Sequence, residues 1–175
     1  MSVTFTVIRL DGGAPPRTGD RPPEIDARFS AGGYGSFLVR LAASAGLARE
    51  WGPYHAARRR ASELVMRRAI PEAGENLAVL EKRLAQAQER VAHLRQALEA
   101  RQEQVPLLRF LLSDHSSDPL TCEQCACIAP VLRAAVEPWT PTGDGRSGPR
   151  ECALSVADAM EFVAAHPGWG VAVID

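Results

Sequence analysis

Three cysteines stand close together in the second half of the chain, at Cys122, Cys125 and Cys127. Thiolates and imidazole rings are the ligands of tetrahedral zinc sites, so these residues, with His115 and Cys152, are candidate metal ligands. Such a site usually needs a second Cys-x-x-Cys or His-x-x-x-His pair, and the sequence has none. Helical spacing places Cys122 and Cys125 on one face and turns Cys127 away from it. The pattern therefore favours reduced cysteines that pack as small apolar side chains, with no metal and no cofactor.

Asp114 and His115 are candidates for acid–base chemistry, and the segment from Asp114 to Asp118 resembles the start of a calcium-binding loop. Pro119 stands where such a loop requires glycine, and Cys125 stands where it requires a bidentate glutamate. No nucleophile motif accompanies the Asp–His pair. An enzyme or a metal protein is therefore the third of three functional hypotheses.

A helix predicted over residues 54–69 carries five arginines against a single acidic residue, Glu63. The arginines are Arg58, Arg59, Arg60, Arg67 and Arg68. Such a face could contact the phosphates of a nucleic acid, or it could be a solvated face whose long stems cover apolar surface. The whole chain has 20 basic and 21 acidic residues and a formal net charge of -1, which predicts no general attraction to nucleic acid or to an anionic membrane. Nucleic acid is therefore not the favoured partner.

The strongest periodicity belongs to one long helix predicted over residues 72–112, which Pro106 would kink or split. Its apolar residues recur at alternating spacings of three and four, as in the a and d positions of a heptad repeat. The predicted interaction seam consists of Leu77, Leu80, Leu84, Val91, Leu94 and Leu98, with Ala87 at the remaining position. A stripe this narrow is typical of a coiled-coil-like contact with another helix.

Charges beside the seam bear on what the long helix packs against. In a parallel homodimer, Arg90 would face Arg95 of the second copy, and these like charges would repel. An antiparallel partner is therefore favoured. Three sources of that partner remain open: another helix of the same chain, a second copy of the chain, or a different protein.

Shorter elements flank the long helix. Alternating and β-branched residues predict strands that would join into a small sheet, because an isolated hairpin is only marginally stable. The predicted strands are residues 3–10, 24–29 and 170–175. The further helices are predicted over residues 31–45, 121–136 and 155–165, with N-caps at Ser30, Thr121 and Ser155. Residues 137–150 are rich in glycine and proline and are predicted to form a mobile linker.

The composition, with 46% hydrophobic and 23% charged residues, is that of a globular chain. No signal peptide is expected, because the opening residues lack its basic and apolar regions, and no apolar run is long enough to span a membrane. The clustered cysteines favour a reducing, cytoplasmic location. The expected fold class is α+β and predominantly α-helical. It comprises a helical bundle or hairpin with the long heptad-patterned helix, and a small sheet formed by the chain termini, in a single domain of residues 1–175.

The segment Phe110–Asp118, followed by Thr121–Leu132, resembles small actinobacterial hypothetical proteins of unknown function. Those proteins carry a His-Ser-Ser-Asp turn, then a capped helix that contains cysteine, and an apolar terminal strand. This chain departs from their pattern with Asp118-Pro119 in place of Asp-Gly, and the heptad segment 72–105 is additional. The resemblance implies a bacterial origin and a similar fold, and it implies no activity.

Together these features favour a non-enzymatic interaction or accessory protein that acts through the long amphipathic helix. The alternative is a small regulatory or nucleic-acid-associated protein that uses the arginine-rich helix 54–69. The expected partner is another protein or an antiparallel second copy, and no membrane is expected to take part.

Overall fold

The computed structural model describes residues 2–10, 22–23, 25, 27–70, 76–114, 117–141 and 148–174. Within this part of the chain, six helices accompany a three-stranded antiparallel sheet in the order β2-β1-β3. The strands are β1 (Ser2–Arg9), β2 (Arg28–Ser30) and β3 (Trp169–Ile174). The helices are α1 (Ala31–Ser44), α2 (Ala48–Ala69), α3 (Leu77–Glu99), α4 (Leu107–Leu112), α5 (Cys122–Val136) and α6 (Pro149–Ala165). This confirms a mostly helical α+β fold, and none of the described helices is long and apolar enough to cross a membrane.

The sheet joins the two ends of the chain, as the alternating patterns predicted. β1 is the central strand and pairs with β3 over six of its eight residues, from Thr4 opposite Ile174 to Arg9 opposite Trp169. β2 is shorter than the predicted strand 24–29: only residues 28–30 pair with β1, and the described residues before Arg28 are not in a strand. Residues 24 and 26 lie outside the described residues.

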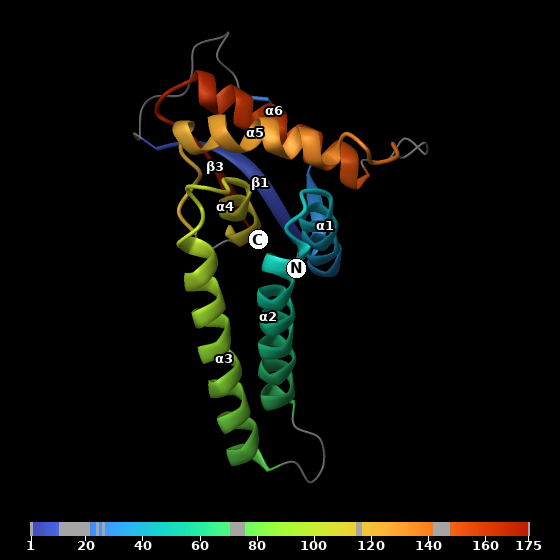
Figure 1. The fold of residues 1–175 in the computed structure, drawn as a ribbon, viewed down its shortest axis with the longest axis vertical. Helices are drawn as coiled ribbons and strands as arrows, with labels where there is room; N and C mark the ends of the chain where they lie inside the picture. The colour runs from blue at the N-terminus through green and yellow to red at the C-terminus, as the bar shows by residue number, and fades with distance from the viewer. Residues whose placement is uncertain are drawn as a thin grey trace.

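The main core lies where the sheet meets α1, α4, α5 and α6 (Figure 1). Phe5 of β1 is buried and stacks on Phe110 of α4, with ring centroids 5.5 Å apart. Phe29 of β2 and Tyr34 of α1 also pack against the ring of Phe5. Aromatic side chains bury the largest apolar areas of any residues, so this cluster fixes the sheet against the helices.

Two helix caps have the geometry that the sequence indicates. The Ser30 hydroxyl accepts a hydrogen bond from the Gly33 backbone N–H at 3.1 Å and so starts α1. Thr121 and Gln124 form the reciprocal capping box of α5. At the end of α1, Gly46 has a φ of +74°, the left-handed conformation in which glycine commonly ends a helix.

The predicted helix 72–112 is not continuous. It is divided into α3, a turn over residues 100–106, and α4, so the chain is split in the region where Pro106 predicts a kink or a break. Pro106 instead occupies the N-cap of α4. Conversely, the helix predicted from residue 54 begins at Ala48 and contains Pro53, since burial of Trp51 makes the earlier turns favourable.

Parts of the segment 137–150, which was predicted to be a linker, are packed or helical in the structure. Trp139 is 5% exposed, packs on Phe37 and donates a hydrogen bond from its indole nitrogen to Ser44 Oγ at 2.7 Å. The last helix, α6, already begins at Pro149, with Gly148 at the N-cap, so Ser155 lies inside the helix instead of capping it. Proline is favoured at this first helical position, which explains the early start. Residues 142–147 lie outside the described residues.

Helices α2 and α3 form an antiparallel hairpin that projects away from the main core (Figure 1). Leu64 of α2 packs with Leu80 and Leu84 of α3 in a small cluster that is separate from the main core. Near the far end of the hairpin, Arg68 forms an ion pair with Glu81 at 3.4 Å. The far half of the hairpin therefore depends on a few buried leucines.

We expect Leu84→Ala to lower the free energy of unfolding of the hairpin by about 2–3 kcal/mol, because it leaves a cavity among three leucines. Leu77→Ala is the matched control. Leu77 is 50% exposed, so its truncation should cost less than about 1 kcal/mol. Hydrogen exchange should rise in residues 60–69 and 77–88 of the Leu84 variant while α5 and α6 stay protected. Equal effects of the two substitutions would contradict the separate leucine cluster.

Candidate functional site

The predicted interaction seam is largely used within the chain. Leu80 and Leu84 face Leu64 of α2, and Leu98 is buried in the main core. Val91 and Leu94 are half-buried and pack against the main core. Only Leu77 is well exposed, because α2 ends at Ala69 and no longer covers the first turn of α3. The seam therefore has an antiparallel partner in the same chain, and its buried leucines are not available to another protein.

One carboxylate holds the base of the hairpin. Asp114 Oδ2 lies 3.4 Å from Arg58 Nη2 of α2 and 3.6 Å from Arg95 Nη1 of α3. The Asp114 side chain is 12% exposed, so these contacts are partly shielded from water. Arg95 Nε also donates to Glu99 at 2.7 Å. Asp114 thus joins both hairpin helices to the segment that follows α4.

A local turn holds Asp114 in place. The Ser117 backbone N–H donates to the Asp114 carbonyl at 2.9 Å, and the Ser117 hydroxyl donates to Asp114 Oδ1 at 3.1 Å. Beside this turn, the Tyr34 hydroxyl donates to the Ser113 carbonyl at 3.4 Å, and burial raises the pKa of Tyr34. His115 and residue 116 lie outside the described residues. The described neighbours of Asp114 therefore act as a structural junction, with two arginines to satisfy its charge.

His55 lies on α2 one turn before Arg58 and stacks on the buried Trp51, with ring centroids 4.8 Å apart. Burial lowers the pKa of His55, and the positive charges of Arg58 and Arg59 lower it further. The imidazole is therefore favoured in its neutral form at the hairpin base.

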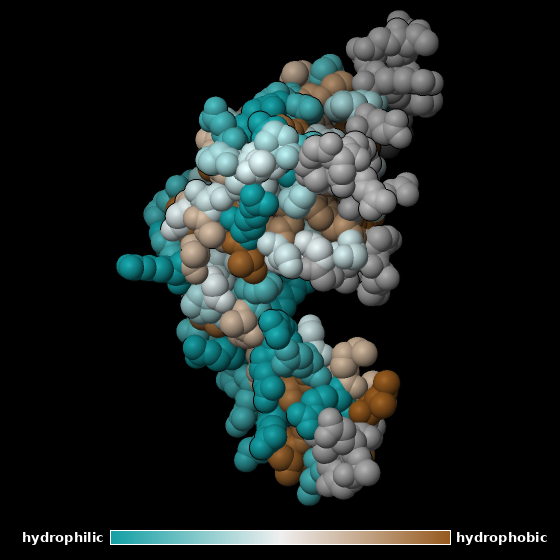
Figure 2. Space-filling view, turned by 90° about the vertical axis from the view of Figure 1, so that its right-hand side faces the viewer, coloured by the Kyte–Doolittle hydropathy of each residue, from teal (hydrophilic) through white to brown (hydrophobic). Residues whose placement is uncertain are grey.

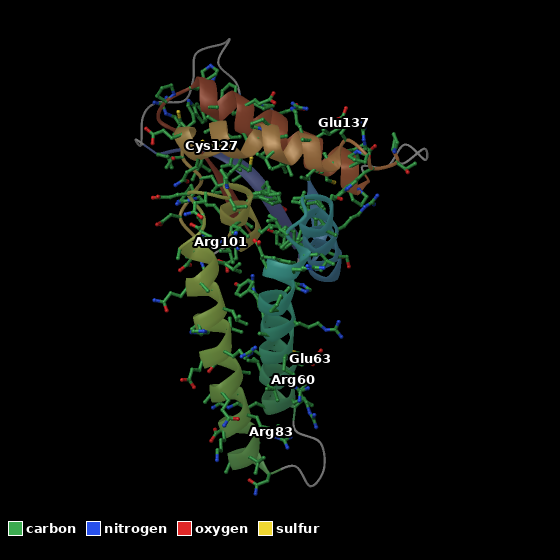
Figure 3. All side chains as sticks on the ribbon, in the orientation of Figure 1. Arg60, Glu63, Arg83, Arg101, Cys127 and Glu137 are labelled. Atoms are coloured by element: carbon green, nitrogen blue, oxygen red, sulfur yellow. The ribbon has the colours of Figure 1, made fainter. Side chains whose placement is uncertain are left out.

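The five predicted phosphate contacts lie on α2, and four of them are held by carboxylates. Arg58 is bound to Asp114, and Arg68 to Glu81. Arg59 and Arg60 share Glu63, at 3.1 and 3.6 Å (Figure 3 labels Arg60 and Glu63). Arg67 is half-buried. Ion pairing reduces the positive potential that a nucleic acid would meet.

A surface hollow of about 530 Å³, the hairpin groove, runs between α2 and α3. Its lining residues recur at helical spacing along one face of each helix. They are Arg58, Ala61, Ser62, Val65 and Met66 of α2, with Gln88, Val91, Ala92 and Arg95 of α3. Apart from Arg58, Ser62, Gln88 and Arg95, the lining side chains are apolar, so the hairpin presents a largely apolar depression.

Exposed apolar residues are concentrated on this hairpin. Of the nine large hydrophobic side chains that are well exposed in the described part of the chain, five belong to it: Val65, Met66, Ile70, Leu77 and Val79. Figure 2 shows hydrophobic side chains among the hydrophilic surface of this part of the molecule. Sequence reasoning overlooked Val65 and Met66. The run Leu64-Val65-Met66 could have revealed exposed apolar residues, because three consecutive apolar residues cannot all face one side of a helix.

The cysteines do not converge on a metal site. Cys125 is buried and Cys127 is exposed, and no group of three or more metal-binding side chains occurs among the described residues. Burial, with a smaller contribution from the neighbouring Cys122, raises the pKa of Cys125 to about 12, so the thiol keeps its proton. The Cys125 thiol contacts the Leu120 carbonyl at 3.7 Å, in agreement with a structural role.

We expect Asp114→Asn to lower the free energy of unfolding by about 1–3 kcal/mol, because it leaves two arginines without their shared carboxylate. Asp158→Asn is the matched control: Asp158 pairs with Arg133 at a position that is 56% exposed, where an ion pair contributes less than about 1 kcal/mol. Urea unfolding at low and high salt would measure both losses. Similar losses for the two variants would rule out a special role for the junction.

The pKa of His55 also makes stability depend on pH. Because this pKa is lowered in the folded state, the unfolded chain binds more protons just below the ordinary value of 6.5. The contribution of His55 to the free energy of unfolding should therefore be fully present above pH 6.5 and should be lost as the pH falls below that value. His55→Gln should flatten this decrease in unfolding curves measured across the range. An unchanged slope would show that other groups cause it.

The hairpin thus combines an arginine-rich face on α2 with an apolar groove and a charged junction that join residues of different helices. No protein-family model, no curated protein and no solved structure matches this chain.

Proposed function

We propose that this chain is a non-enzymatic interaction protein that binds a protein partner through its α2–α3 hairpin. The observation that carries the proposal is the exposed apolar surface of the hairpin. Ile70 is 74% exposed and Met66 is 63% exposed, while the main core buries its large apolar residues almost completely. Contiguous exposed apolar surface is unfavourable in water and is typical of protein–protein contact sites.

The shape of the hairpin supports the same function. Two helices that project from a core expose more surface than the same residues would in a compact layer, and this arrangement reduces their own burial. The described hairpin is nevertheless well formed, with a capped α3 and ion pairs along it. A rigid projecting element offers its surface to a partner at little cost in conformational entropy.

The contact surface differs from the one that the heptad pattern predicted. Leu80 and Leu84 are covered by α2, so the surface that we propose consists of Val65, Met66 and the neighbouring residues of the groove. Methionine suits this position because its flexible, polarisable side chain adapts to different partner surfaces.

Capture of partners from an extract of the source cells tests the proposal. Wild-type protein and the Met66→Asp variant would be immobilised at equal amounts, and the bound proteins would be compared by quantitative mass spectrometry. We expect Met66→Asp to reduce capture of a specific protein by about tenfold or more, because a buried charge opposes the apolar contact.

Val131→Asp is the matched control. Val131 is 39% exposed on α5, away from the hairpin, so this variant should retain capture and the same unfolding midpoint. If both variants bind the same proteins as the wild type, the hairpin is not the contact surface and the proposed function is wrong.

A further inference from the structure

The apolar groove of the hairpin continues into a basic surface. A second hollow, of about 570 Å³, lies on the outer side of α2 and shares Ser62 and Met66 with the hairpin groove. Its charged lining consists of Arg59, Arg60, Glu63 and Arg67, which we call the basic flank. Met66 therefore stands between an apolar hollow and a positively charged one.

The groove has dimensions that can accommodate a third helix. Its lining residues follow α2 from Arg58 to Met66, which is about 12 Å at 1.5 Å per residue. Ala61, Ser62 and Ala92 are small, so the backbone of a third helix can approach to the usual packing distance of roughly 8–10 Å. Two to three turns of helix would cover the groove and complete a three-helix packing unit.

The charges around the groove determine which kind of helix can bind there. The two hollows are lined by five arginines and, among the described residues, one carboxylate, Glu63. Asp114 and Glu99 hold Arg58 and Arg95 from outside the lining, so the excess positive charge lies on the basic flank. There, Arg59 and Arg60 share Glu63 and are 75% and 57% exposed, which leaves guanidinium donors facing water.

We infer that the hairpin groove binds an acidic amphipathic helix of a different protein. The apolar face of that helix lies in the groove, and its acidic side chains reach the arginines of the basic flank. This inference rests on the proposed function and names the class of partner. A second copy of this chain would present the same excess of arginines, and the two positively charged surfaces would repel each other. A nucleic acid would use the basic flank, but none of the residues that line the groove is an aromatic side chain on which its bases could stack.

Helical peptides test this inference directly. Two stapled peptides of about 15 residues share leucines at positions i, i+3, i+4 and i+7, with glutamates on one flank in the first and lysines in the second. Their affinities for the full chain would be measured by fluorescence anisotropy. We expect the acidic peptide to bind at least about tenfold more tightly than the basic one.

Matched variants locate the contact. Arg60→Glu should weaken the acidic peptide by about tenfold or more, and Met66→Ser should weaken both peptides. Arg83→Glu is the control for charge: it makes the same change on α3 but lies outside both hollows, so its effect should stay below about twofold (Figure 3 labels Arg60 and Arg83). Equal losses from Arg60→Glu and Arg83→Glu would show an effect of overall charge and overturn the inference.

Three further outcomes would also overturn it. The first is that neither peptide binds, or that both bind equally. The second is that a single-stranded oligonucleotide displaces the acidic peptide, with an affinity that decreases steeply between about 50 and 200 mM salt. The third is a dimer in sedimentation experiments that Met66→Ser abolishes. If the peptides fail while Met66→Asp still prevents capture of a cellular protein, the acidic-helix inference is wrong and the proposed function stands.

Discussion

The position of the hairpin depends on the junction at its base, where the Asp114 carboxylate meets Arg58 and Arg95. A two-helix hairpin cannot bury enough apolar surface to be stable by itself, and here only Leu64, Leu80 and Leu84 form its own cluster. The remaining support comes from the base, where Trp51, Tyr54 and Leu98 enter the main core. At this base, the Asp114 carboxylate adds directional contacts to both helices, beside the apolar packing.

This arrangement separates two uses of apolar side chains on the same helix. On α2, Leu64 faces α3, whereas Val65 and Met66 face the groove and water. Substitutions of exposed residues should therefore affect binding while leaving the fold intact, and substitutions of the leucine cluster should affect the fold first. Arg58 and Arg95 belong to both categories, since they line the groove and also hold Asp114. Contact with a partner at this end would be coupled to the junction that orients the hairpin.

The sequence predicted those elements well that are determined by interactions between residues close in the sequence. The caps at Ser30 and Thr121 use side chains three residues from the groups they bind, so sequence spacing is enough to find them. The alternation in β1 and β3 likewise follows from burial of one face of a strand. The predictions that failed concern segments whose structure depends on contacts between residues far apart in the sequence. Trp139 packs on Phe37 and bonds to Ser44, a contact across about a hundred residues that composition does not reveal in a segment rich in glycine and proline.

The 3.5-residue repeat of the apolar residues is enough to predict that residues 77–98 form a helix with one narrow apolar face. The sequence by itself also shows that α2 is rich in arginine. That α2 is the partner of this face follows from the three-dimensional arrangement of the helices, since a heptad stripe specifies the shape of a contact and not its source. The tertiary contacts also pair four of these arginines with Glu63, Glu81 and Asp114, and they place Met66 between the groove and the basic flank. Ion pairs and surface hollows depend on distances in space between helices, and the order of residues along a chain does not specify them.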